Sequence, residues 1–152
     1  MNYLQRESLQ VTPHTAPLHS QITLPGSKSI TNRALLLAGL AQGDSLISGA
    51  LSSDDTKYMA AALRQLGVDV EKRSDTEFLV QGTGRLQSSA QPLFLGNAGT
   101  ATRFLTAAAL LIEGETVVDG DEGMRKRPIS GLTNTLREMG VAVTETLSLI
   151  HI

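Results

Sequence analysis

A short basic turn near the start of the chain has the residue types of an anion-binding site. Lys28 lies between Ser27 and Ser29, directly after a Pro-Gly pair, and Arg33 follows one turn and a residue beyond Ser29. An apolar run comes next, which predicts that a helix begins here. The start of a helix carries unpaired N–H groups and a partial positive charge, which suit a phosphate or a carboxylate. A capped helix start with solvated basic side chains is the alternative.

A second turn has the composition of a backbone that a ligand can approach closely. Gly96-Asn97-Ala98-Gly99-Thr100 contains two glycines and an asparagine, which permit positive φ angles. Arg103 follows this turn as Arg33 follows the first one. An ordinary left-handed turn that leads into a helix explains the same residues. Both interpretations stay open at the level of the sequence.

The densest cluster of positive charge is Arg125-Lys126-Arg127-Pro128. Proline is favoured at the first helical position, so this run predicts a helix over 129–139 with Arg127 at or beside its N-cap. A solvated basic face is the alternative for such a run. Converging Lys and Arg side chains are what a site for a small polyanion requires, and three basic turns favour that site. We expect Asp54 and Asp55 to cap a helix rather than to act as a carboxylate pair.

Composition narrows the classes of function. The 152 residues carry a net charge of −2 and only 3% aromatic residues, which disfavours a nucleic-acid partner. No apolar run is long enough for a signal peptide or a membrane span, so we expect a cytoplasmic protein without a membrane partner. Cysteine is absent, which excludes thiolate ligands and a cysteine nucleophile within these residues. The three histidines have no partners at metal-ligand spacing, and no metal is predicted.

An internal repeat organises the basic turns. Residues 63–70, LRQLGVDV, recur as residues 136–143, LREMGVAV, 73 positions later. Apolar runs, glycine stops and turn residues predict the order β-α-β-α-β-β for each unit, which makes this an α/β protein. The units are expected at about 21–84 and 92–146, after an N-terminal segment over 1–20. In the first unit the predicted elements are strands over 21–24, 44–48, 68–72 and 77–80, and helices over 27–41 and 54–66.

Two apolar runs predict that the fold includes further units. Residues 34–41 and 104–112 are apolar on every side of a helix, so we expect them to be buried all round within a larger array.

The last six residues, 147–152, fit neither the repeat nor what precedes them. They match the translation of a transposon-end sequencing adapter, CTGTCTCTTATACACATC, and we predict a non-native tail.

The two long turns together resemble a known family. LPGSKSITNRALLLA at 24–38 is similar to the first signature of the 5-enolpyruvylshikimate-3-phosphate synthases, and LFLGNAGTATR at 93–103 resembles the second. Residues 53–55 and 124–128 also match, and the resemblance covers about 18–146. It implies six β-α-β-α-β-β units of the enolpyruvyl transferase fold, in two domains. About one and two-thirds of those units are present here.

The resemblance also implies an activity. The family transfers the enolpyruvyl group of phosphoenolpyruvate to the 5-hydroxyl of shikimate 3-phosphate and releases phosphate, as a step toward chorismate and the aromatic amino acids. It needs no metal or organic cofactor, and we expect the full-length protein to be a monomer. Lys28 would be catalytic and would touch both substrates. The implied contacts to shikimate 3-phosphate are Lys28, Ser29 and Arg33, and those to phosphoenolpyruvate are Lys28, Asn97, Gly99, Thr100 and Arg127, with Arg103 in support.

The chain also departs from the family pattern. Phe104 stands where many relatives have Pro, which leaves open the response to glyphosate, the family's inhibitor at the phosphoenolpyruvate site. Gly123 stands where many have Arg. The acid–base carboxylates of the family come from later in the protein, so these residues alone are expected to be inactive. Two alternatives remain. The first is the enolpyruvyl transferase that acts on UDP-N-acetylglucosamine, which normally has Lys-Asn in the first motif and a reactive Cys loop in the region of residues 110–125, whereas this chain has Lys28-Ser29 and no Cys. The second is a non-catalytic anion-binding module or an inactive fragment.

Overall fold

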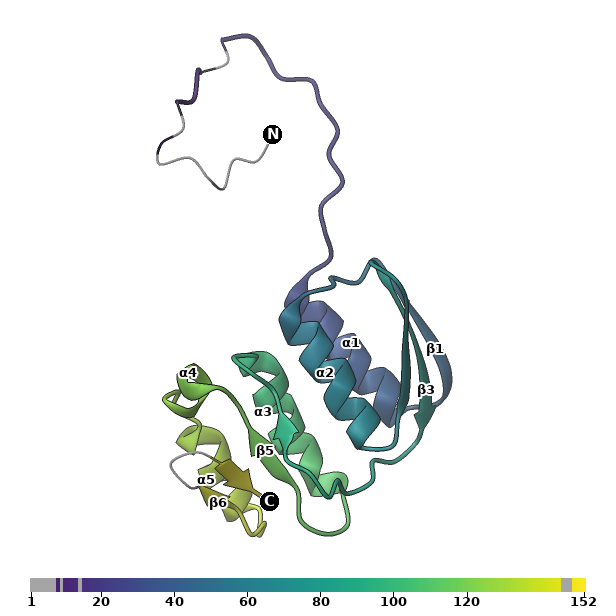
Figure 1. Cartoon of the computed structure of the whole chain (residues 1–152), viewed down its shortest axis with the longest axis vertical. Helices are drawn as coiled ribbons and strands as arrows, with labels where there is room; N and C mark the ends of the chain where they lie inside the picture. Colours follow the sequence, from purple (N-terminus) through teal and green to yellow (C-terminus); the bar gives the residue numbers. More distant parts are fainter. Residues whose placement is uncertain (1–7, 9, 14, 146–148) are drawn as a thin grey trace.

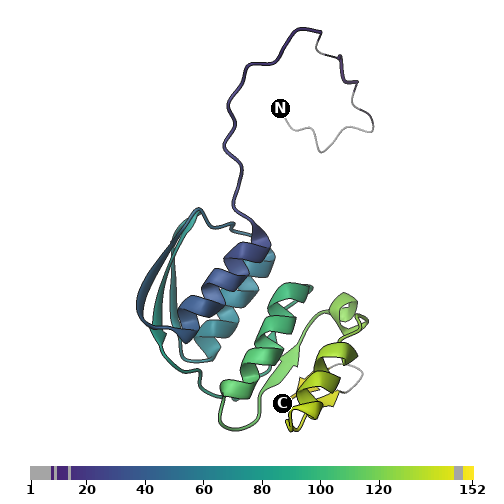
Figure 2. The same cartoon turned by 180° about the vertical axis from the view of Figure 1, so that it is seen from behind.

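The computed structural model describes residues 8, 10–13, 15–145 and 149–152, and it shows two α/β units side by side (Figure 1). An exposed, extended segment leads into the first unit, and the view from behind shows that it packs on neither of them (Figure 2). Within the described ranges, no helix has the length and apolar character that a membrane span requires.

The first unit is a three-stranded antiparallel sheet covered by two helices. Its elements in chain order are α1 (Lys28–Leu40), β1 (Gln42–Ser48), α2 (Asp54–Gln65), β2 (Asp69–Ser74) and β3 (Glu77–Thr83). The strands pair in the order β1-β3-β2, with Leu46 opposite Leu79 and Val70 opposite Val80. Serines 27 and 53 cap α1 and α2, and this agrees with the helix starts that the sequence predicts.

The second unit repeats this plan with shorter elements. They are β4 (Leu93–Phe94), α3 (Gly99–Ala108), the 3-10 helix η2 (Ala109–Leu111), β5 (Val117–Asp119), α4 (Glu122–Arg125), α5 (Ser130–Glu138), β6 (Thr144–Glu145) and β7 (Leu149–His151). The sheet order β4-β5-β7-β6 contains β5-β7-β6, which corresponds to β1-β3-β2 of the first unit. The two units therefore share one topology, which confirms the internal repeat.

The end of the chain differs from expectation. Leu149–His151 pairs antiparallel with β5 and β6 and takes the place that β3 has in the first unit. The backbone groups of Thr116 and Ile152 also exchange hydrogen bonds of 2.7 and 3.0 Å. The expectation that this tail lies outside the repeat is therefore wrong for 149–152, while residues 147 and 148 lie outside the described residues. Its origin in an adapter sequence stays a prediction.

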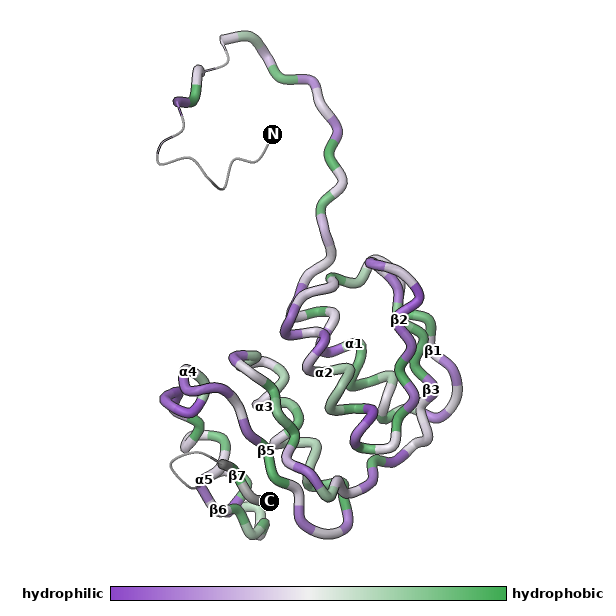
Figure 3. Tube along the Cα trace, in the orientation of Figure 1, coloured by the Kyte–Doolittle hydropathy of each residue, from purple (hydrophilic) through white to green (hydrophobic). Residues whose placement is uncertain are grey.

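The core lies where α1, α2 and α3 meet each other and the first sheet. Leu35 of α1, Met59 and Leu63 of α2, Val80 of β3 and Leu105 of α3 are all at most 1% exposed. Fully burying a side chain of this size is worth about 1.5–3 kcal/mol. Figure 3 shows apolar segments gathered along these helices and a hydrophilic chain around α4. The core therefore joins the two units and holds the starts of α1, α2 and α3 near one another.

One predicted strand and one predicted helix start are wrong. Residues 21–24 form no strand, and Ile22 and Leu24 are each 75% exposed. A strand needs a hydrogen-bonded neighbour, and none pairs with these residues in the part of the chain that the structure describes. Pro128 does not open α5, because Ile129 is its N-cap and Ser130 its first residue. The cause is the short helix α4, after which Arg127 closes a turn onto the Met124 carbonyl before α5 begins.

The apolar helices are not buried on every side. Ile30 and Leu37, on one face of α1, are each 67% exposed, and Leu111 of η2 is 62% exposed. Leu37 and Leu111 belong to the apolar runs 34–41 and 104–112, so the described residues do not cover these runs on every side. The prediction that a larger array covers this face stays a prediction.

Candidate functional site

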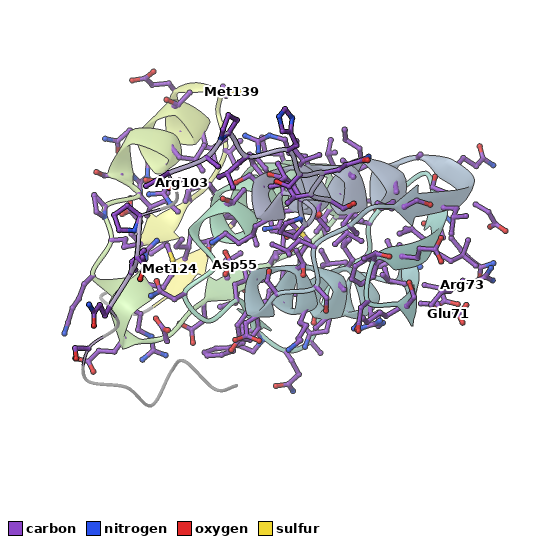
Figure 4. The ribbon with its side chains drawn as sticks, turned by 90° about the horizontal axis from the view of Figure 1, so that it is seen from above. Asp55, Glu71, Arg73, Arg103, Met124 and Met139 are labelled. Carbon is purple, nitrogen blue, oxygen red and sulfur yellow. The ribbon has the colours of Figure 1, made fainter. Side chains whose placement is uncertain are left out.

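An open pocket of about 390 Å³ lies where the two units meet. Four cationic side chains and one carboxylate line it, together with Phe104 and the second basic turn; its lining is Lys28, Arg33, Asp55, Asn97, Gly99, Thr100, Arg103, Phe104 and Arg127. Figure 4 places Asp55 between the helices of the first unit and Arg103, far from Glu71 and Arg73 on β2. Seven of the eight predicted site residues therefore share one cavity. The exception is Ser29.

Three helices begin at this pocket. Lys28 is the first residue of α1, Asp55 the second of α2, and Gly99 and Thr100 open α3. Ser27 and Ser53 cap the first two helices, but the N-cap of α3, Ala98, makes no side-chain cap bond. The amides of Thr100 and Ala101 precede the first helical hydrogen bond of α3, from Thr102 N to Ala98 O, so they have no intrahelical partner. An uncapped helix start among cations suits an anion.

Lys28 is held at the pocket by a carboxylate. Its Nζ lies 3.1 Å from Oδ2 of Asp55, and the two side chains are 48% and 22% exposed. The pair joins the starts of α1 and α2. Sequence reasoning assigns Asp55 only to the cap of α2, so this contact was missed. The local sequence could not predict this ion pair, because the pair depends on how α1 and α2 pack against each other.

Arg33 reaches the second unit. Its guanidinium lies 4.9 Å from the centroid of the Phe104 ring, within the range of a cation–π contact, and its NH1 donates to the Ser29 carbonyl at 2.9 Å. Ser29 is half-buried on α1 and does not line the pocket. The departure at Phe104 thus gives Arg33 a platform that a proline ring would not provide.

The second basic turn is held by both units. Gly96 has a φ of +52°, the left-handed region that favours glycine, and a Cβ there would lie 2.4 Å from the Tyr58 ring of α2. On its other side, the Gly96 carbonyl accepts from Asp121 N at 3.0 Å. Gly99 does not have a positive φ, and its N–H donates to the Asn97 carbonyl at 3.0 Å. Positive φ is thus needed at the first glycine of the turn and not at the second.

The space beside Gly99 is taken by two arginines. A Cβ on Gly99 would lie 2.9 Å from NH1 of Arg127 and 3.2 Å from NH1 of Arg103. Arg103 donates to the carbonyls of Gly99 at 3.2 Å and Pro128 at 3.1 Å, so it ties the start of α3 to the segment that carries Arg127. Among the described residues, Arg127 is paired with no carboxylate. Its charge is therefore available to a ligand.

A second ion pair anchors the segment that carries Arg127. Arg125 donates from Nε to Oδ1 of Asp119 at 3.0 Å and from NH2 to Oδ2 at 2.8 Å, and Gly120 N donates to Oδ1 at 2.7 Å. The hydrogen bond from Arg125 lowers the pKa of Asp119 below its usual range, against the opposing effect of burial. Sequence reasoning placed Arg125 in a basic cluster and missed Asp119. Arg125 thus serves the structure, while Arg127 faces the pocket.

Replacing Asp119 with asparagine should lower the stability of the protein at neutral pH. Because the folded state lowers this pKa, the carboxylate stabilises the fold above its unfolded pKa of about 3.9, and the effect is lost as pH falls through the folded value. The midpoint of urea unfolding should therefore differ between the two proteins at pH 7, and the difference should shrink below about pH 4.

Glu122→Gln is the matched control for Asp119→Asn. Glu122 pairs with Lys126 at 2.6 Å, but both side chains are exposed, so this pair should add little. Equal effects of the two substitutions at pH 7, or a difference that persists unchanged in acid, would contradict the prediction.

Comparison with known sequences gives a family and close relatives. A family model described as EPSP synthase (3-phosphoshikimate 1-carboxyvinyltransferase) matches residues 13–149. A 3-phosphoshikimate 1-carboxyvinyltransferase of Rhizobium leguminosarum bv. trifolii is 62% identical over 136 residues, which are 90% of this chain and 32% of the relative. The protein of the same name from Pseudomonas savastanoi pv. phaseolicola is 58% identical over 137 residues, or 90% and 33%. The chain thus spans about a third of the length of these relatives.

Comparison with solved structures agrees. An EPSP synthase from Acinetobacter baumannii superposes with a TM-score of 0.80 at 29% identity, over 85% of this chain and 31% of that one. The agreement confirms the predicted fold class, repeated α/β units of the enolpyruvyl transferase type.

Proposed function

The chain belongs to the EPSP synthase family, and we propose that it provides one side of the active site of an enolpyruvyl transferase. The substrates are phosphoenolpyruvate and shikimate 3-phosphate, the group transferred is enolpyruvyl, and the acceptor is the 5-hydroxyl of shikimate 3-phosphate. One observation supports this most directly: Lys28, Arg33, Arg103 and Arg127 line a single pocket at which three helices begin. Both substrates carry a phosphate and a carboxylate, and such a pocket attracts both.

We assign one substrate to each of the two units. Lys28 and Arg33 come from α1, and we assign shikimate 3-phosphate to this side, with Ser29. Phosphoenolpyruvate would lie against the uncapped start of α3, where Gly99 and Thr100 face Arg127, with Asn97 at the rim and Arg103 in support. The assignment of Ser29 rests on the family resemblance alone.

Lys28 would touch both substrates and act on the reaction itself. A base takes the proton of the 5-hydroxyl as its oxygen bonds to C2 of phosphoenolpyruvate, and an acid adds a proton to C3, so that a tetrahedral intermediate with a methyl group forms. A proton of that methyl group is then lost as the C2–O bond to the phosphate breaks, which restores the double bond and releases phosphate. Negative charge builds on the phosphate oxygens as the C–O bond breaks, and an ammonium beside them stabilises that charge. The acid–base carboxylates would come from other parts of the enzyme. A monomeric state and a location in the cytoplasm stay predictions, as does the absence of a cofactor.

A chimera tests the proposal. Residues 13–145 would replace the equivalent segment of the Rhizobium leguminosarum relative, which supplies the remaining two-thirds of the enzyme. We expect phosphate release that requires both substrates, at a rate within about tenfold of the parent enzyme. The 152-residue polypeptide alone should release none above background, because it lacks the opposing side of the site. A chimera that unfolds cooperatively but releases no phosphate would overturn the proposal.

A further inference from the structure

Among the residues that the structure describes, Asp55 is the one carboxylate in the lining of the cationic pocket. It contacts the residue proposed to act in the reaction, with Asp55 Oδ2 3.1 Å from Lys28 Nζ. A carboxylate in a site for two polyanions opposes their binding by simple charge repulsion. We therefore expect Asp55 to make a favourable contribution that offsets its repulsion of the substrates.

Capping of α2 does not account for Asp55. Ser53 and Thr56 already form a capping box at the start of this helix. Asp54 occupies the same first turn and interacts with the same helix dipole, but it is 82% exposed and pairs with Lys57 on the surface. Asp55 is 22% exposed and turned toward Lys28. The two neighbouring aspartates therefore share the first turn of α2 and differ in what they face.

Lys28 has physical reasons to leave the pocket if nothing holds it. It stands at the start of α1, where the partial positive charge of the helix repels an ammonium. Arg33, Arg103 and Arg127 add further repulsion from the lining. Its four-carbon stem is flexible, and its side chain is half-exposed, so solvent is an available alternative.

We infer that Asp55 is a positioning residue for Lys28. It holds the Lys28 ammonium in the pocket between the two units before the substrates arrive. This inference rests on the proposed function. It predicts an unusual division of kinetic effects. Removing the carboxylate makes the pocket more positive, so ground-state binding of both anions should be unchanged or tighter. The ammonium is then misplaced for the reaction, and small misplacements of a catalytic group lower the rate strongly.

The test uses Asp55→Asn in the chimera, which keeps the shape of the side chain and removes its charge. We expect kcat to fall about tenfold, while the KM values for both substrates stay the same or decrease. Asp54→Asn is the matched control, because it removes the neighbouring carboxylate from the same helix turn. It should leave kcat and both KM values within about twofold of the parent.

The Lys28→Ala background separates positioning from a general structural role. If Asp55 acts through Lys28, Asp55→Asn should cause no further loss of kcat in that background. Melting temperatures of the parental chimera and of the four variants show whether each one folds. Raised KM values with a lowered melting temperature, or a full additional loss in the Lys28→Ala background, would overturn the inference. Equal effects of Asp54→Asn and Asp55→Asn in an active chimera would also overturn the inference, but the proposed function would stand. An inactive parental chimera overturns both.

Discussion

Lys28→Ala in the chimera should lower kcat/KM by about two to three orders of magnitude, or more if Lys28 serves both substrates. A charge contact made in the transition state of a closed site is worth about 3–4 kcal/mol. Lys28 is the cation at the start of α1, and it lies in one pocket with Gly99 and Arg127 of the second unit. The substitution should leave the fold intact, because the side chain is half-exposed and contributes little to the core. Initial rates with each substrate varied in turn measure the effect.

Lys57→Ala provides the control for charge removal near the site. Lys57 is 65% exposed on α2 and pairs with Asp54 on the surface. Its loss should change kcat/KM by less than about twofold. A loss below tenfold for Lys28→Ala would reduce Lys28 to a solvated residue at a helix start.

Gly99→Ala should weaken ligands of the phosphoenolpyruvate side and spare shikimate 3-phosphate. The new methyl group would meet NH1 of Arg127 at 2.9 Å and NH1 of Arg103 at 3.2 Å. Both atoms are the far ends of flexible side chains, so they would move, and Arg127 would leave its place in the pocket. Glyphosate is longer than phosphoenolpyruvate and should clash first. We expect its inhibition constant to rise by more than about tenfold, the KM for phosphoenolpyruvate to rise less, and that for shikimate 3-phosphate to stay nearly constant.

The structure removes the competing explanation of backbone strain. Gly99 is absent from the glycines with positive φ, so alanine fits its backbone without the penalty of the left-handed region. Gly131→Ala is a suitable control, since Gly131 lies on α5 and a Cβ there would meet nothing within 4 Å. It should be neutral or slightly stabilising. If glyphosate, phosphoenolpyruvate and shikimate 3-phosphate all weaken by one factor while the melting temperature falls, Gly99 is only a turn residue.

Local signals in the sequence predicted the helices and the repeat well. Ser27 and Ser53 cap α1 and α2, and Gly67, with a positive φ, follows the end of α2, so these helix boundaries depend on residues a few positions apart. The copies at 63–70 and 136–143 predict two units of one topology from the sequence alone. The basic turns at 28 and 97–100 could be found for the same reason. Residue type and a helix start together define them.

The tertiary structure alone decided which charges meet. Lys28 and Asp55 stand 27 positions apart, and Arg33 and Phe104 stand in different units, so only packing of α1 against α2 and α3 joins them. The same holds for Asp119, which marks Arg125 as structural and leaves Arg127 to face the pocket. A strand also needs a neighbour, and residues 21–24 alternate between polar and apolar side chains but pair with no strand among the described residues. Propensity acts over one turn of chain, whereas ion pairs, ladders and pockets depend on segments that the sequence separates and the core brings together.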